Sequence, residues 1–201
     1  MVSGQGREAP PLGLGLKGTW IELVEAGAEA EGELVRFHLR RRLTPAMGSG
    51  ARTPASPFAP PMLIRSLRDG AIVGSVENHA LPGGVATVVI YLDPDLGRAG
   101  FGLEAAVLYI SHLFDSGARL VSADVLSFNA PIIGIMRKAG WQPQARLREH
   151  VYAAGRLWDV LVYSFDRESW SAALKRHARR LPGGDLRPAA LGRRGGRAPG
   201  G

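Results

Sequence analysis

The sequence predicts a domain of mixed α/β class, and residues 85–114 provide the main evidence. Residues 85–92 form an apolar, largely β-branched run bounded by Pro82-Gly83-Gly84 and Asp93-Pro94, which favours a buried strand. A turn with three glycines follows. Beyond it, apolar residues recur at helical spacing and predict an amphipathic helix: Leu103, Ala106, Val107, Ile110, Leu113 and Phe114.

The turn between this strand and helix, Gly97-Arg98-Ala99-Gly100-Phe101-Gly102, has the features of a phosphate site. Glycine lets the backbone turn tightly and approach a ligand, and the first amides of a helix have no acceptor inside it. Such amides suit a phosphate group. A glycine-containing turn without any ligand explains the same spacing equally well, because short glycine motifs are common.

Four segments lie before residue 62. Residues 1–15 are rich in Gly and Pro and are expected to be disordered. Residues 19–25 alternate well enough to predict a first strand. Residues 29–42 predict a helix or a strand. Residues 44–61 contain five prolines and two glycines, which indicates a long loop.

Residues 62–67 and 71–81 predict a hairpin that turns at Arg68-Asp69-Gly70. On its second strand Ser75, Glu77 and His79 alternate, so their side chains share one face. A polar face of this kind usually lies toward solvent. The functional alternative is that Glu77 or His79 acts as a base.

After the central helix, residues 120–126 predict another buried strand, and a second helix follows it. Asn129 is a suitable N-cap, and Pro131 lies in the first turn, where proline is tolerated. Gly140 suits the position just after the last turn.

A last helix is expected from Asp166, a suitable cap, to about residue 180. Phe165 and Trp170 are spaced as a hydrophobic staple for it. Residues 181–201 are rich in Gly, Pro and Arg and are expected to form a disordered tail. These boundaries leave one domain over residues 16–180, and 201 residues suit one domain with flexible ends.

The net charge of +7 is confined to the C-terminal end. Residues 175–201 hold eight Lys or Arg and one Asp, whereas residues 1–174 hold 17 basic and 17 acidic side chains. A basic tail can contact nucleic acid or acidic surfaces. No nucleic-acid recognition motif accompanies the charge, so a solvated tail is favoured over a nucleic-acid partner.

The composition excludes several kinds of chemistry. The sequence has no cysteine, so disulfides and thiolate catalysis are excluded. Its five histidines are scattered without zinc-ligand spacing, so no metal site is predicted. No apolar run reaches the roughly 18 residues of a membrane span, and the N-terminus lacks the apolar region of a signal peptide. We therefore expect a cytoplasmic location and no membrane partner.

Three segments resemble the GNAT superfamily of acyltransferases. Gly100-Phe101-Gly102, followed by Glu104-Ala105, resembles the end of motif A, R/Q-x-x-G-x-G/A. The stretch from Asn129 to Trp141 resembles N-x-x-S-x-x-x-x-E-K-x-G-F. The stretch from Leu147 to Tyr163 resembles L-R-E-H-x-Y-x-x-G-x-x-x-D-x-x-x-Y, the closing hairpin of the branch that acetylates ribosomal proteins and protein N-termini.

The chain departs from the family pattern at several positions that bear on cofactor binding and catalysis. Gly97 stands where motif A has Arg or Gln, and Ile132 replaces a Ser that can donate a proton. Met136 stands where many members carry a proton-donating Tyr, and Val151 where some carry a catalytic Glu. We expect packing roles at Ile132 and Met136, and packing or hydrogen-bonding roles for two tyrosines of the closing hairpin, Tyr152 and Tyr163.

The resemblance covers about residues 16–170 and implies the GNAT fold, a mixed and mostly antiparallel sheet of about seven strands flanked by helices. It implies a splay between the fourth and fifth strands for the pantetheine arm of an acyl-CoA. Backbone groups of the fourth strand would bind that arm, and amides of the turn would bind its pyrophosphate, while Asn129 would line the cysteamine end. The implied residues are Ile90, Tyr91, Leu92, Arg98, Ala99, Gly100, Phe101, Gly102, Leu103 and Asn129.

The resemblance implies an acyl-CoA-dependent N-acyltransferase, most simply an N-acetyltransferase that uses acetyl-CoA. The acceptor would be a small-molecule amine or a peptide N-terminus, and Glu77, His79 and Glu149 are the catalytic candidates. Two alternatives stay open: a biosynthetic enzyme that acts on acyl groups of an acyl carrier protein, and a non-catalytic acyl-CoA-binding protein. Residues 44–61 lack the helices that shape the acceptor side in this family, so that side is open or completed by the second subunit of a homodimer.

Overall fold

The computed structural model describes residues 15–25, 56–93, 95, 100–153 and 155–177. The expectations for residues 1–14, 29–42 and 181–201 lie outside these residues, as do those for most of the 44–61 loop. Arg98 and Ala99 of the glycine turn also lie outside them. Among the described residues, no helix is long and apolar enough to cross a membrane.

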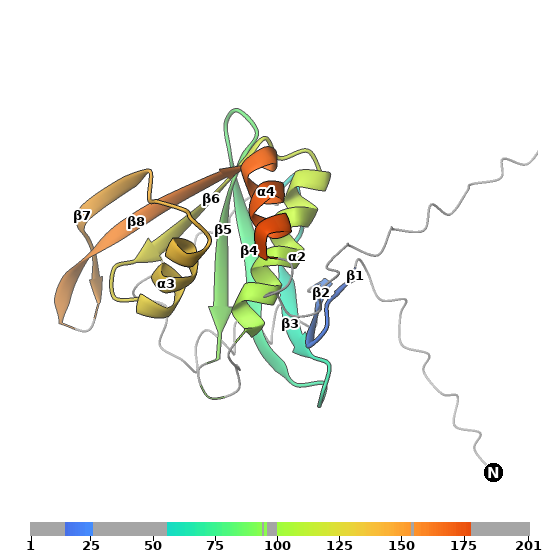
Figure 1. Ribbon diagram of the computed structural model, residues 1–201. Coiled ribbons are helices and arrows are strands. Elements are labelled where there is room, and N and C mark those ends of the chain that lie inside the picture. The colour runs from blue at the N-terminus through green and yellow to red at the C-terminus, as the bar shows by residue number, and fades with distance from the viewer. Residues whose placement is uncertain (1–14, 26–55, 94, 96–99, 154, 178–201) are drawn as a thin grey trace, which may run out of the picture.

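The described residues form one sheet of eight strands with three helices, which confirms the predicted fold class (Figure 1). The strand order is β1-β2-β3-β4-β5-β6-β8-β7, and every neighbouring pair is antiparallel except β5 and β6. The strands are β1 (Gly15–Lys17), β2 (Ile21–Glu25), β3 (Met62–Ser66), β4 (Ile72–Leu81), β5 (Val85–Leu92), β6 (Leu120–Leu126), β7 (Ala145–Ala153) and β8 (Arg156–Asp166). The helices are α2 (Phe101–Asp115), α3 (Ala130–Lys138) and α4 (Arg167–His177).

Most strands lie where the sequence predicts them. Strands β5 and β6 have the predicted bounds, and β3 and β4 form the predicted hairpin. The short strand β1 was not predicted, because three residues are too few to show a periodic pattern.

Helix α2 packs on one face of the sheet and supplies much of the core. Its largest buried side chains are Tyr109, Leu113 and Phe114. One buried polar link joins this helix to the sheet: the Asn78 amide on β4 donates to the Tyr109 hydroxyl at 2.7 Å and to the Ala59 carbonyl at 2.9 Å. Burial raises the pKa of Tyr109 to about 12, so this hydroxyl stays protonated and can donate to the Pro60 carbonyl.

The caps of α3 and α4 are the predicted residues. The Asn129 side chain accepts from the Ile132 amide, and Gly140, just past the end of α3, has φ 81°. The Asp166 carboxylate accepts from the Ser169 amide at 2.7 Å, and this bond lowers the pKa of Asp166. Phe165 lies 5.5 Å from Trp170 between ring centroids, as expected for the staple.

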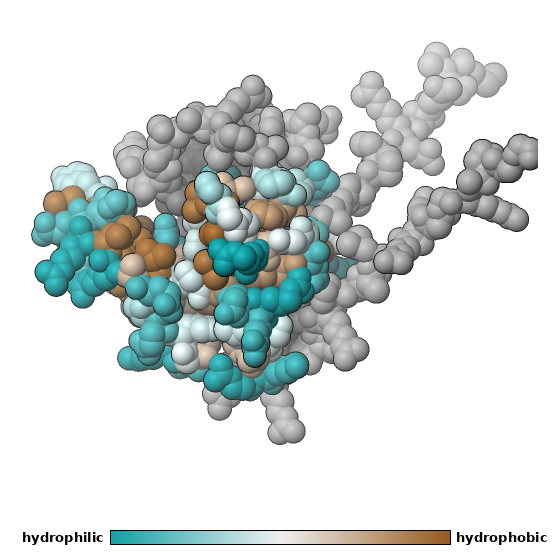
Figure 2. Space-filling view, turned by 90° about the horizontal axis from the view of Figure 1, so that it is seen from above, coloured by the Kyte–Doolittle hydropathy of each residue, from teal (hydrophilic) through white to brown (hydrophobic). Residues whose placement is uncertain are grey.

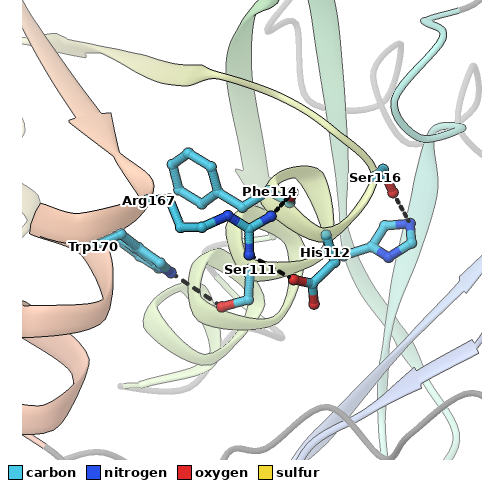
Figure 3. A network of polar contacts seen from close by, with 7 residues as sticks. Ser111, His112, Phe114, Ser116, Arg167 and Trp170 are labelled. Atoms are coloured by element: carbon cyan, nitrogen blue, oxygen red, sulfur yellow. Dashed lines mark hydrogen bonds and ion pairs between the residues drawn. The ribbon is translucent and has the colours of Figure 1, made fainter.

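Helix α4 is held against the C-terminal end of α2 by polar contacts (Figure 3). Arg167 donates to the Asp115 carboxylate at 3.0 Å and to the Phe114 carbonyl, and the Trp170 indole donates to the Ser111 hydroxyl at 3.1 Å. The Trp170 ring also stacks on Trp141, which follows α3. These contacts join the three helices on one side of the sheet (Figure 1).

The β7–β8 hairpin extends away from the helices, and exposed hydrophobic residues gather on this part of the molecule (Figure 2). Tyr163 is 2% exposed, as its expected packing role requires. The packing role expected for Tyr152 is wrong, because 65% of this residue is exposed. Tyr152 pairs with Leu157 near the end of the hairpin, whereas Tyr163 pairs with Ala123 of β6 inside the sheet.

Candidate functional site

Strands β5 and β6 separate halfway along their length. They are paired only from Val85 with Leu120 to Val88 with Ala123, although each strand continues for several residues. Beyond that point β5 stays paired with β4 as far as Leu92, and β6 stays paired with β8 as far as Leu126. The expected splay between the fourth and fifth predicted strands is therefore present, between β5 and β6.

The peptide groups of β5 alternate between its two neighbours. The Asp93 amide donates to the Val73 carbonyl of β4 at 2.8 Å, which fixes the direction of this alternation. Tyr91 accordingly presents its N–H and C=O to β4, whereas Ile90 and Leu92 present theirs to the splay. Two of the three predicted β5 residues thus have backbone groups directed toward the gap.

The N-terminus of α2 lies at the same end of β5 as the splay. A Cβ atom added to Gly102 would lie 2.8 Å from Cδ1 of Leu92, so the first turn of the helix approaches the end of β5 closely. The first helical hydrogen bond runs from the Glu104 amide to the Gly100 carbonyl at 2.9 Å. The amides of Phe101, Gly102 and Leu103 consequently have no acceptor inside the helix.

A fully buried carboxylate, that of Glu104, ties the turn between β1 and β2 to the first turn of α2. It accepts from the amides of Thr19, Trp20 and Ile21, the last two at 3.1 and 3.2 Å. Three amide donors compensate the burial of this charge. The same contacts place the Trp20 indole against Gly100, the N-cap of α2.

Gly100 has to be a glycine for two reasons. Its φ is 100°, in the left-handed region that side chains with a Cβ atom disfavour. A Cβ atom at this position would also lie 2.6 Å from Cζ3 of Trp20. The close approach of Trp20 to the start of α2 therefore depends on the missing side chain.

Acidic residues from two strands border the splay on one face of the sheet. The pairing of β5 with β6 ends at Val88 and Ala123, so Val89 and Asp124 are the first residues of the two strands beyond it. Glu77 of β4 lies opposite Val89. Alternation puts Asp124 on the same face as Ser122, whose hydroxyl lies 2.8 Å from that of Thr87. His79 lies opposite Thr87, in the closed part of the sheet.

The environment of this face perturbs two of its ionisable groups. Burial raises the pKa of Asp124, and His150 opposes that shift. Burial also raises the pKa of the Tyr91 hydroxyl, and the charge of Glu77 and a hydrogen bond to it add to the increase. Tyr91 is therefore a neutral hydrogen-bonding partner of Glu77.

No protein-family model matches this chain, and no curated protein matches it by sequence. Solved structures do match. The GCN5-related N-acetyltransferase from Brucella melitensis has a TM-score of 0.61 at 19% identity, over 83% of this chain and 84% of that one. Mycobacterium smegmatis RimJ in complex with CoA-disulfide has a TM-score of 0.62 at 16% identity, over 84% and 94%. The ribosomal-protein-S5-alanine acetyltransferase from Vibrio fischeri has a TM-score of 0.63 at 14% identity, over 79% and 99%.

This chain has the GNAT fold. Within that fold, the structure brings together only part of the residues that the sequence singled out. The splay is bordered by the β5 residues, the start of α2 and Glu77. Glu149 lies away from the splay, because its strand, β7, is separated from β5 by β6 and β8.

Glu149 has a local backbone role. A register shift separates the pairs formed by Leu147 and Val151, and Glu149 lies within this bulge with φ 47°. Its amide donates to the Asp159 carboxylate at 2.8 Å, and this bond, with Arg146, lowers the pKa of Asp159. The side-chain oxygen of Asn129 likewise has a local partner, because it caps α3 by accepting from the Ile132 amide.

Asp124 is the acidic residue beside the splay that sequence reasoning missed. Its signal is a single carboxylate within the apolar run of residues 120–126. Such a residue is easily taken for the exposed side of an alternating strand. Its importance follows from the place where β6 leaves β5, which is a property of tertiary pairing.

We predict that Glu104→Ala lowers the free energy of unfolding by about 3 kcal/mol, because the amides of Thr19, Trp20 and Ile21 lose their common acceptor. Glu104→Gln keeps one acceptor oxygen and should cost less. Asp115→Ala, which removes the exposed ion pair with Arg167, is the control and should cost less than about 1 kcal/mol. Urea denaturation measures all three variants; equal losses at Glu104 and Asp115 would contradict the assigned role of the buried carboxylate.

Proposed function

We propose that this protein is an acyl-CoA-dependent N-acyltransferase, and specifically an N-acetyltransferase. The observation that carries the proposal is the splay, where the β5 edge that β6 leaves ends beside the N-terminus of α2. A thioester carrier with amide groups in its arm and a pyrophosphate at its other end matches these two features. The similarity to solved GNAT acetyltransferases supports the same activity.

In this proposal the donor is held mainly by backbone groups. The N–H and C=O groups of Ile90 and Leu92 would pair with the amides of the pantetheine arm, as an added strand pairs with a sheet edge. The amides of Phe101, Gly102 and Leu103 would bind the pyrophosphate at the positive end of the helix. Gly100 fits this turn because its φ of 100° and the Trp20 ring packed against it leave no room for a side chain.

The reaction needs a neutral amine next to a polarised thioester carbonyl. The amine nitrogen attacks the carbonyl carbon, the carbon–sulfur bond breaks, and the coenzyme leaves as a thiolate that takes up a proton. The amine loses its proton to Asp124 or Glu77, directly or through water. Burial raises the pKa of Asp124 above that of an ordinary aspartate, which makes its carboxylate the more basic for this task.

The acceptor in this proposal is a primary amine, either of a small molecule or of a peptide N-terminus. Two of the similar structures are named RimJ and ribosomal-protein-S5-alanine acetyltransferase, which favours a peptide N-terminus. The acidic residues Asp124 and Glu77 border the splay and would attract a cationic amine before it loses its proton.

The activity is tested by incubating the purified protein with acetyl-CoA and a panel of amines and N-terminal peptides. Release of free thiol is a clean measure, because the chain contains no cysteine. We expect release that requires an amine. Turnover only with an acyl carrier protein would support the biosynthetic alternative, and coenzyme binding without turnover under any condition would support a non-catalytic binder.

We predict that Asp124→Asn lowers kcat about a hundredfold, because the acceptor amine loses its proton acceptor. Glu77→Gln should also lower kcat, since Glu77 borders the same splay. Glu149→Gln should have much the smallest effect, because two strands separate its strand from β5. Steady-state kinetics with saturating acetyl-CoA compares the three variants. A larger loss of kcat for Glu149→Gln than for Asp124→Asn would contradict the assignment of Asp124 as the proton acceptor.

We predict that Gly100→Ala weakens coenzyme A binding, because the new methyl group displaces Trp20 and strains the start of α2. Gly117→Ala is the matched control: its φ is 99°, but a Cβ atom there would meet nothing within 4 Å. Both variants carry the cost of a left-handed alanine, so the difference isolates the site. Calorimetric titration measures the affinity, and equal dissociation constants would exclude the turn as the binding element.

A further inference from the structure

Trp20 is exposed and yet firmly held. The structure leaves 42% of this residue exposed, which is unusual for an indole that packs on a helix N-terminus. Its amide donates to Glu104, and its carbonyl accepts from the Leu67 amide at 2.8 Å. Both flanking amides, of Thr19 and Ile21, also donate to Glu104. The backbone that carries the indole is therefore fixed on both sides.

The segment that carries Trp20 lies on the opposite side of β5 from the splay. The strand order places β2, which begins just after Trp20, three strands from β5, whereas β6 flanks β5 on its other side. The strand registers place the start of β2 and the end of β5 at the same end of the sheet, through Ile21 with Ser66 and Gly74 with Leu92. Trp20 and the splay thus border the start of α2 from two directions.

We propose that Trp20 is a binding residue for the nucleotide half of the acyl donor, with its indole packed against the adenine ring. The inference rests on the proposed function and extends it. If the pyrophosphate binds at the start of α2 and the pantetheine arm enters the splay, the other half of the molecule must leave in a different direction. Trp20 offers an aromatic surface there, and its fixed backbone reduces the ordering cost of binding.

The proposal separates the two halves of the ligand. A base stacked on an aromatic side chain loses about tenfold or more in affinity when that side chain is truncated. The phosphopantetheine half should not respond, because its proposed partners are backbone groups of β5 and of the first turn of α2. A purely structural role for Trp20, such as shielding Gly100, would instead weaken the binding of both halves.

The test compares coenzyme A with 4′-phosphopantetheine, which lacks the adenosine, by calorimetric titration. We expect Trp20→Ala to raise the dissociation constant of coenzyme A at least about tenfold and to leave that of 4′-phosphopantetheine unchanged. Tyr152→Ala, which removes an exposed aromatic ring from the β7–β8 hairpin, is the control and should change neither constant.

Two further variants keep the test decisive if Trp20→Ala does not fold. Trp20→Phe retains an aromatic face and should keep most of the affinity for coenzyme A. Trp20→Leu retains a large apolar side chain without an aromatic ring and should lose most of that affinity. Equal losses for both ligands, or no loss for either, would overturn the role of Trp20 while the parent protein still binds coenzyme A. Failure of the parent protein to bind coenzyme A would overturn the proposed function itself.

Discussion

The separation of β5 from β6 is the constraint on which the rest of this structure depends. Peptide groups inside a domain need partners, so an opening in the middle of a sheet is stable only when each strand is held from its other side. Here β4 pairs with the whole of β5, and β8 pairs with the whole of β6. The hydroxyls of Thr87 and Ser122 meet where the strands are still joined. The opening is thus built into the pairing of four strands, and it leaves the peptide groups of Ile90 and Leu92 directed into it.

A second fixed point stands beside the opening. The buried carboxylate of Glu104 lies in the first turn of α2, where the helix dipole favours a negative charge, and three amides of the β1–β2 turn surround it. This arrangement joins the first described strands of the chain to the start of the central helix. It also explains two glycines, since a Cβ atom on Gly18 would meet the Glu104 carboxylate and one on Gly100 would meet Trp20. The start of α2 is therefore held in place by contacts within the protein itself.

The sequence predicted what depends on local pattern. The bounds of β5 and β6, the cap at Asn129 and the cap at Asp166 follow from apolar periodicity, turn residues and short polar side chains, all of which act within a few residues. It did not predict what depends on pairing between distant segments. Asp124 borders the splay because the pairing of β6 with β5 ends just before it. Glu149 is far from β5 because β6 and β8 lie between β5 and β7. Tyr152 is exposed because the β7–β8 hairpin extends beyond the helices. Strand order and register decide these three placements, and no short motif encodes them.

The central claim is that an acyl donor occupies the opening by pairing with the free edge of β5. Amide hydrogen exchange, followed residue by residue with and without coenzyme A, tests it most directly. The account predicts new protection at Ile90 and Leu92 and at the first amides of α2, with little change at Tyr91, whose peptide group already faces β4. Saturation with coenzyme A that leaves the exchange of Ile90 and Leu92 unchanged would contradict it.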